Sequence, residues 1–316
     1  MGNKWVSLLG QYETLVNGIA FKGGSVIDDG KTYINIGNFL YDAAFSSGEI
    51  SCDVIFSDIK ENTGCEIIIF YDSQYGHFVT AGISNDKTIM FTIRHFDATE
   101  GKSKWTYHGY AGDKKNLKPN QKYSLKVKLQ GSRVSLSVDN IEVLTRDIPF
   151  NLPQSSPGIW CSGLCDINIT NFNVISERPK AFVIMQYTSP YNELYSSVIK
   201  KVCDDFGIEA IRADETYTPG IIISDVSKQI INSKFIIAEI SPTNSNVFYE
   251  VGYAHALNKP TILLADRNSK LPFDVSPFRT LFYENSIAGK EKIEEGLRKY
   301  LSSIMKEVNI SSPPLP

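Results

Sequence analysis

Two different spacings of hydrophobic residues divide the chain. From about residue 33 to residue 175, short segments alternate apolar and polar positions between turn residues, which indicates antiparallel β-strands. The clearest segment places Tyr123, Leu125, Val127 and Leu129 on one face. We expect about ten short strands with no helix between them, and therefore two packed sheets or a barrel. Further strands are expected at 50–56, 66–71, 78–83, 89–95, 134–138, 141–144 and 167–174.

The second pattern begins after Pro179. A continuous apolar run, 181–185, is typical of a strand buried on both faces of a parallel sheet, and helical spacing then continues to Gly207. Further strands are expected at 208–211, 234–240, 261–264 and 280–283, and helices at 221–231, 247–257 and 290–305. This alternation predicts a doubly wound, flavodoxin-like sheet of about five parallel strands.

We therefore predict two domains, an all-β sandwich over 1–175 and an α/β domain over 180–316, with a disordered tail from Ser311 to Pro316. The chain is 42% hydrophobic and 21% charged with a net charge of -3, so it lacks the basic footprint of a nucleic-acid-binding protein. It has no membrane-length apolar run and no signal-like opening, so we expect a cytoplasmic protein that contacts no membrane. Five scattered cysteines suit reduced thiols, and four separated histidines predict no metal site.

Polar residues follow the predicted strands of the second domain, where an open α/β sheet binds its ligands. They lie at 185–187, 212–215, 239–246 and 266. A helix led by Asn246 would carry Glu250 and Tyr253 on one face and turn Val251 and Ala254 inward. Beside several aromatic residues, Glu250 would be partly desolvated, which raises a carboxyl pKa and suits an acid, base or nucleophile. The spacing alone fits an exposed glutamate near a helix N-terminus equally well.

Four segments carry a resemblance: 182–185 (FVIM), 212–215 (RADE), 238–241 (AEIS) and 244–256 (NSNVFYEVGYAHA). Together they resemble the nucleoside 2-deoxyribosyltransferase-like and TIR-like group of bacterial proteins, over essentially all of 180–301. The resemblance implies that Glu250 is the catalytic carboxylate and that Asp225 handles the sugar or base. The implied substrate-binding residues are Met185, Gln186, Arg212, Asp214, Asp225, Ser241, Asn246 and Tyr253. The chain departs from the group at two places. Its residues 241–246 differ from the stretch that contacts the acceptor base in the transferases, and Glu239 stands where the group commonly has an aspartate.

The resemblance implies cleavage of a nucleotide N-glycosidic bond, with NAD as a substrate and no cofactor. A carboxylate near C1′ can stabilise an oxocarbenium-like state or form an ester. A TIR-like NAD hydrolase is the leading hypothesis. A nucleoside 2-deoxyribosyltransferase and a non-catalytic nucleotide-binding signalling module are the alternatives. Arg212 would either pair with a phosphate or bridge to Asp214 or Glu215.

The first domain carries a second resemblance, in the strands 123–129 and 134–138, the segment 157–160 (PGIW) and the strand 169–172. These resemble the concanavalin A-like (laminin G-like) jelly roll, which implies a sensor or scaffold, since the Glu-x-Asp-x-x-Glu pattern of its glycosidases is absent. Aromatic residues that could form a glycan platform are Tyr71, Tyr75, Trp105, Tyr107 and Tyr110, although core positions fit them better. By analogy, the combination suggests a bacterial antiviral defence protein. Two further hypotheses are that the sandwich binds a glycan or protein ligand and that the chain forms a homo-oligomer.

Overall fold

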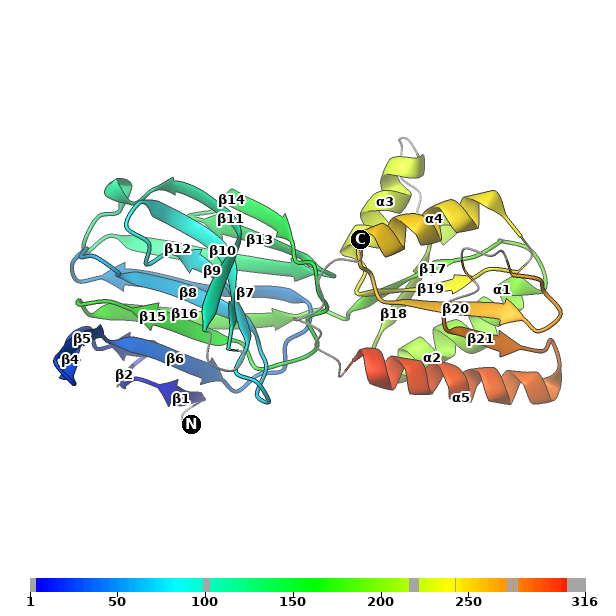
Figure 1. Ribbon diagram of the computed structural model, residues 1–316, viewed down its shortest axis with the longest axis horizontal. Helices are drawn as coiled ribbons and strands as arrows, with labels where there is room; N and C mark the ends of the chain where they lie inside the picture. The colour runs from blue at the N-terminus through cyan, green and yellow to red at the C-terminus, as the bar shows by residue number, and fades with distance from the viewer. Residues whose placement is uncertain are drawn as a thin grey trace. The chain divides into compact units, whose positions relative to one another are not determined.

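The computed structural model describes residues 4–98, 103–215, 222–241, 243–271, 275 and 278–305 (Figure 1). The chain forms two compact units. The first takes 1–129, 133–148 and 154–177, and the second takes 130–132, 149–153 and 178–316. The predicted tail at 311–316 lies outside the described residues.

The first unit is a sandwich of two antiparallel seven-stranded sheets and a small hairpin. One sheet runs in the order β1 (Trp5–Leu9), β6 (Ile36–Tyr41), β15 (Gly158–Ser162), β8 (Gly64–Tyr71), β9 (Phe78–Ile83), β10 (Ile89–Asp97) and β11 (Lys104–Asp113). The other runs β14 (Ile141–Asp147), β13 (Arg133–Val138), β12 (Lys122–Gln130), β7 (Gly48–Phe56), β16 (Ile167–Ser176), β3 (Gly18–Phe21) and β2 (Tyr12–Leu15). The hairpin is β4 (Ser25–Asp28) with β5 (Lys31–Ile34), and one 3-10 turn, η1, covers Lys114–Asn116.

The alternation predicted for the sandwich is present in its strands. In β12, Tyr123, Leu125, Val127 and Leu129 are all buried, because successive side chains point to opposite faces of a sheet. The jelly-roll-like sandwich followed by an α/β unit therefore confirms the predicted fold class.

The number of strands was underestimated. The described part of the first unit contains sixteen strands, and six of them, β1 to β6, lie largely before or at the start of the predicted region. Strand β11 was missed as well, because its residues are mostly half-buried or exposed and leave only weak alternation. Short, exposed strands such as β4 give no period from which they could be recognised.

Strands β8 and β9 are buried on both faces, unlike the half-exposed strands that the alternation predicted. Glu66 of β8 and Arg94 of β10 form an ion pair in which the carboxylate and the guanidinium are 2.5 Å apart and almost completely buried. The Trp105 ring lies 3.8 Å from the guanidinium carbon and the Trp160 ring 4.9 Å from it, so aromatic rings cover the charge. A paired, hydrogen-bonded charge can be buried where a single one could not.

Two of the histidines are not separated, which corrects the sequence-based expectation. Nδ1 of His95 and Nε2 of His108 are 2.8 Å apart, and the two rings stack. Burial lowers the pKa of both, to about 4 for His108, so this pair is uncharged near neutral pH. The neighbours β10 and β11 bring them together across thirteen residues of sequence.

The second unit contains one parallel sheet in the order β18 (Glu209–Arg212), β17 (Lys180–Ile184), β19 (Phe235–Glu239), β20 (Thr261–Asp266) and β21 (Thr280–Tyr283). Its helical segments are α1 (Tyr191–Leu194), the π segment η2 (Tyr195–Ile199), α2 (Lys200–Asp205), η3 (Ala213–Glu215), α3 (Ile222–Asn232), α4 (Ser245–Ala256) and α5 (Ile287–Ile304). Each predicted strand and helix of this unit is present to within a few residues.

Helices cover both faces of the parallel sheet (Figure 1). Phe235 and Ile237 of β19 pack with η2, α2 and α5, whereas Ile236 and Ala238 pack with α3 and α4. A strand buried on both faces must be apolar throughout, which explains the continuous hydrophobic runs seen in the sequence. None of the described helices is long and apolar enough to cross a membrane.

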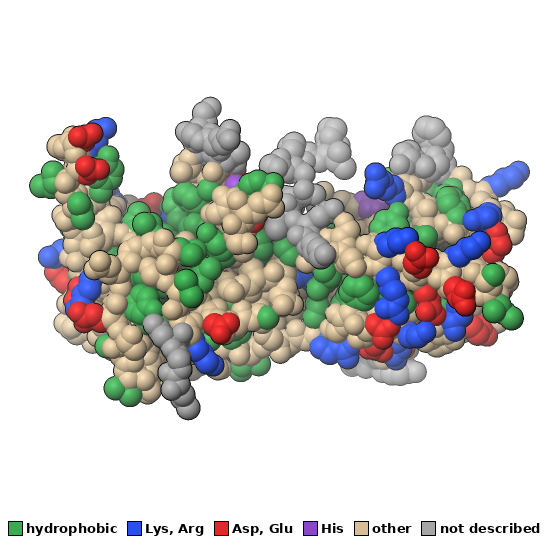
Figure 2. All heavy atoms as spheres, turned by 90° about the horizontal axis from the view of Figure 1, so that it is seen from below, with side chains coloured by type: hydrophobic (Ala, Val, Ile, Leu, Met, Phe, Trp, Pro, Cys, Tyr) green, Lys and Arg blue, Asp and Glu red, His purple; other side chains and the backbone are tan. Residues whose placement is uncertain are grey.

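Figure 2 shows cationic and anionic side chains interspersed over the face of the second unit that carries α5. Lys201 of α2 pairs with Glu294 of α5 at 3.1 Å, and Lys299 pairs with Glu295 along α5 at 2.6 Å. Such exposed pairs contribute little stability, and this face has the mixed charge of a solvated surface.

Candidate functional site

A pocket of about 350 Å³ opens at the carboxyl ends of the strands, on the side of the sheet covered by α3 and α4. Its walls are the segment after β17, the start of η3, helix α3 and the first two turns of α4. The lining residues are Met185, Gln186, Tyr187, Ala213, Val226, Asn244, Asn246, Val247 and Glu250. This is where an open α/β sheet is expected to bind a ligand.

Helix α4 sets the position of the glutamate. Asn244 caps the helix by accepting a hydrogen bond from the backbone N–H of Asn246 at 3.0 Å. Val247, Val251 and Ala254 are buried and fix the rotation of the helix against the sheet. With that face inward, Glu250 in the second turn is directed to the pocket.

Glu250 is partly buried, and burial raises the pKa of its carboxyl to about 7. No ion pair involving Glu250 occurs in the part of the chain that the structure describes. The direction of this pKa shift agrees with the raised carboxyl pKa expected from the sequence, and a pKa of about 7 suits an acid, a base or a nucleophile.

Tyr187 forms one wall of the pocket beside this glutamate. Burial, with the nearby Glu250 carboxylate as the next cause, raises the pKa of its phenol to about 12, although the residue is 38% exposed. The Arg212 guanidinium lies over the Tyr187 ring, 5.1 Å from its centroid. At neutral pH Tyr187 is an uncharged hydroxyl and ring.

Arg212 does not line the pocket. Its Nη2 donates to Asp214 at 2.7 Å and its Nη1 to Asn192 at 2.8 Å, and its guanidinium carbon lies 4.3 Å from the Tyr195 ring. Of the two roles considered from the sequence, bridging to Asp214 is the one present in these contacts. The pair carries no net charge beside the pocket.

Met185, Gln186, Asn246 and Glu250 are the predicted site residues that the fold brings together. Ser241 instead joins two strand ends, since its Oγ accepts the backbone N–H of Asp266 at 2.8 Å. The remaining members lie outside the lining: Arg212, Asp214, Asp225, which is 3.9 Å from Lys228, and Tyr253, which packs on the α3–α4 core.

Tyr187 and Asn244 line the pocket as well; both lie in the strand-end segments 185–187 and 239–246 singled out in the sequence, but neither was among the predicted substrate-binding residues. Tyr187 directly follows the predicted Gln186, and Asn244 opens the asparagine-containing segment of the motif. Their positions were therefore visible in the sequence. Val226 and Val247 contribute apolar side chains to the lining, and Ala213 adds a backbone hydrogen bond with the Tyr187 phenol.

A second carboxyl with a raised pKa lies on the opposite face of the sheet. Glu239 is 1% exposed at the end of β19, and burial raises its pKa to about 7. It accepts hydrogen bonds from the Ser241 backbone N–H and the Tyr283 hydroxyl, each at 3.1 Å. Glu239 does not reach the pocket. Its hydrogen bonds connect the end of β19 to Tyr283 of β21.

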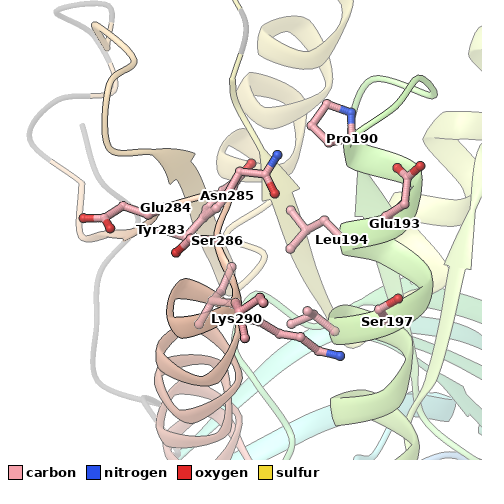
Figure 3. Close-up of a pocket in the computed structure, with 12 residues that line it drawn as sticks. Pro190, Glu193, Leu194, Ser197, Tyr283, Glu284, Asn285, Ser286 and Lys290 are labelled. Atoms are coloured by element: carbon pink, nitrogen blue, oxygen red, sulfur yellow. The ribbon is translucent and has the colours of Figure 1, made fainter.

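A larger cavity, about 440 Å³, lies between the α1–η2 segment and the β21–α5 segment (Figure 3). Of the charged residues that line it, Glu284 pairs with Arg267 at 2.8 Å and Lys290 is 3.9 Å from Glu294, whereas the exposed Glu193 accepts a hydrogen bond from the Ser189 hydroxyl. Figure 3 shows the Glu284 carboxylate directed away from the cavity. The smaller pocket is the better candidate despite its size, because an unpaired, half-buried carboxyl faces it.

On the sandwich, three aromatic residues share one face of β11. Trp105 pairs with Phe96, Tyr107 with Arg94 and Tyr110 with Thr92, and a bulge between the last two pairs keeps both tyrosines on that face. Trp105 belongs to an aromatic cluster with Phe78, Phe96 and Trp160, whereas Tyr107 and Tyr110 are 39% and 63% exposed. The predicted platform is thus partly core and partly surface.

No protein-family model and no curated protein matches the sequence. Among solved structures, the carbohydrate-binding module CBM66 from Bacillus subtilis is similar to the sandwich, with a TM-score of 0.43, 14% identity, and coverage of 54% of this chain and 93% of that one. A 2-deoxyribosyltransferase from Bacillus psychrosaccharolyticus is similar to the C-terminal part, with a TM-score of 0.30, 13% identity, and coverage of 36% and 90%. Each is a likeness of fold at low identity.

Proposed function

We propose that the second unit cleaves the N-glycosidic bond of a nucleotide, with NAD as the substrate, and that Glu250 is the carboxylate at the reacting carbon. The observation that carries the proposal is the placement of Glu250. It faces a pocket at the carboxyl edge of the sheet beside the amide-bearing Gln186 and Asn246, and no cation among the described residues pairs with it.

The reaction breaks the bond between C1′ and the positively charged pyridinium nitrogen. The bonding electron pair moves to the nitrogen, so nicotinamide leaves as a neutral molecule and C1′ gains oxocarbenium character. Water adds to C1′ and releases one proton, which gives ADP-ribose. The ionised Glu250 would stabilise the positive charge at C1′ or form a transient ester there.

The pocket supplies the other elements that this chemistry needs. Gln186 and Asn246 offer both donors and acceptors to the carboxamide of the base or the hydroxyls of ribose. Met185, Val226 and Val247 provide apolar surface that keeps bulk water from the carboxyl. A partly dry site makes the attraction between a carboxylate and a developing cation stronger than in water.

The proposal is tested by chromatographic product analysis with wild type, Glu250→Gln and the matched control Glu295→Gln. Glu295 is an exposed glutamate of α5, paired with Lys299, so its substitution leaves the pocket intact. We expect nicotinamide from wild type and control, and a rate lower by about 10²–10⁴-fold in Glu250→Gln. Equal release by all three proteins would exclude Glu250.

Two other results would change the function. Exchange of bases between a deoxynucleoside and a free acceptor base would identify a nucleoside 2-deoxyribosyltransferase. Nucleotide binding without any product, in concentrated and crowded protein as well, would favour a non-catalytic signalling module.

A role in antiviral defence, in the cytoplasm of a bacterium, is the wider proposal. It rests on pairing an NAD-consuming unit with a sandwich that could sense a signal. The test is phage challenge of cells that carry wild type or Glu250→Gln, with cellular NAD measured in parallel. Protection by both proteins alike would separate defence from catalysis.

The sandwich has a candidate function of its own, glycan binding. The exposed rings of Tyr107 and Tyr110 on one face of β11 favour it, because sugar rings stack on exposed aromatic faces. Retention of the full chain on polysaccharide columns, lost in Tyr110→Ser, is the expected result. Equal retention of the two proteins would remove this face from consideration.

A further inference from the structure

The charge around the Glu250 pocket is one-sided. Of the described residues that line it, Glu250 alone carries a charge at neutral pH, since the other side chains are apolar, amide or phenolic. The nearest guanidinium, that of Arg212, is paired with Asp214. Asp225 and Lys228 of the adjacent α3 are 3.9 Å apart and also balance each other. The ionised pocket therefore has a net negative charge.

The leaving group must fit that charge. A neutral purine or pyrimidine base leaves as an anion unless an acid protonates it, and Glu250 cannot both stabilise C1′ and donate a proton to the base at once. Tyr187, the other ionisable lining residue, holds its proton too tightly to serve as that acid. A pyridinium base needs no proton, because it leaves as a neutral molecule.

The size and the lining of the pocket indicate which part of a substrate it can hold. Its volume of about 350 Å³ is near the lower end of the roughly 300–1,000 Å³ that small-molecule sites span, which suits one nucleoside better than a dinucleotide. In the part of the lining that the structure describes, no lysine or arginine is present to receive a diphosphate. At the start of α4, one of the backbone N–H groups that could bind a phosphate, that of Asn246, is already bonded to the Asn244 side chain.

We propose that this pocket selects N-ribosides whose base is positively charged, and that the nicotinamide riboside half of NAD is its recognition unit, without a contribution from the phosphates. The inference rests on the proposed function and specifies its substrate class. Neutral purine and pyrimidine nucleosides are then poor ligands, because they leave the carboxylate of Glu250 without a countercharge.

The first test compares nicotinamide riboside with its reduced form, dihydronicotinamide riboside, by calorimetry on the full chain. The two have nearly the same shape, but the reduced ring is neutral. We expect the cationic riboside to bind wild type at least about tenfold more tightly at pH 7.5, and Glu250→Gln to bind both about equally. Equal binding of both ribosides by wild type would overturn the proposal.

The second test uses pH. The cation favours the ionised carboxyl, so affinity for nicotinamide riboside should rise between about pH 6 and pH 8 in wild type and stay flat in Glu250→Gln. The charged neighbours named above are paired at both pH values, and the Tyr187 phenol stays neutral. An affinity that does not change with pH in wild type would contradict a role for the carboxylate charge.

The third test separates this inference from the function on which it rests. If the phosphates contribute nothing, kcat/KM for nicotinamide riboside should lie within about tenfold of that for NAD. Turnover of NAD without turnover of the riboside would overturn the inference and leave the hydrolase intact. Turnover of neither, with no binding of either, would remove the proposed function itself.

Discussion

Replacing Glu250 by glutamine should make the second unit more stable at neutral and higher pH, but not at acidic pH. Burial raises the pKa of this carboxyl from 4.5 to about 7. In the unfolded chain the group ionises near 4.5, so wild type loses stability as pH rises from about 4.5 to about 7. Glutamine has a similar shape and no charge to desolvate, so the variant escapes this loss.

The size of the effect follows from the pKa values. A pKa difference of one is about 1.4 kcal/mol, so the rise from 4.5 to about 7 sets an upper limit of about 3 kcal/mol at pH 8. Because the side chain keeps partial contact with solvent, we reduce this and expect a gain of about 1–2 kcal/mol. Near pH 5 most of the gain should be absent.

The chain allows the two units to be followed separately. Trp5, Trp105 and Trp160 are the three tryptophans, and all belong to the sandwich, so their fluorescence reports the first unit. The described α-helices all belong to the second unit, so helical circular dichroism reports that one. Urea unfolding of the full chain at about pH 5 and pH 8 gives both transitions.

The expected result is a higher midpoint of the helical transition in Glu250→Gln at pH 8, with an unchanged fluorescence transition as the internal control. A helical transition that responds equally at both pH values would refute the reasoning, because it would show an effect independent of ionisation. A Glu250→Gln variant that is less stable than wild type at pH 8 would refute the reasoning as well. A gain at pH 8 alone would mark Glu250 as a residue kept at a cost in stability.

Ala213→Leu should fill the smaller pocket and lower nicotinamide release by at least about tenfold. Ser197→Leu, in the larger cavity, should leave nicotinamide release unchanged. The opposite result would show that the substrate binds in the larger cavity. Arg94→Met should destabilise the sandwich by about 3–5 kcal/mol, because it leaves a buried carboxylate without its partner, and tryptophan fluorescence unfolding measures the loss. Tyr283→Phe should cost the second unit about 1–2 kcal/mol by removing the hydroxyl that Glu239 accepts, and the helical transition should shift while fluorescence does not.

The hydrophobic spacing by itself determined the fold of the second unit. Continuous apolar runs such as 181–185 and 235–238, each followed by helical spacing, are typical of strands in a parallel sheet covered by helices on both faces, so their positions gave the strands and the carboxyl edge. Of the site residues that the resemblance implied, Met185, Gln186, Asn246 and Glu250 lie at one pocket. The hydrophobic pattern predicts a strand or helix well where the sequence shows both its periodicity and the residues that end it.

The tertiary structure decided what depends on contacts across the chain. It paired Arg212 with Asn192 and Asp214, gave Ser241 a structural bond, and left Glu250 unpaired among the described residues, none of which the spacing could show. It also brought His95 to His108 and buried Glu66 against Arg94. Sequence fixes which groups are present, but their pKa values and partners depend on packing between segments distant along the chain, and packing exists only once the chain is folded.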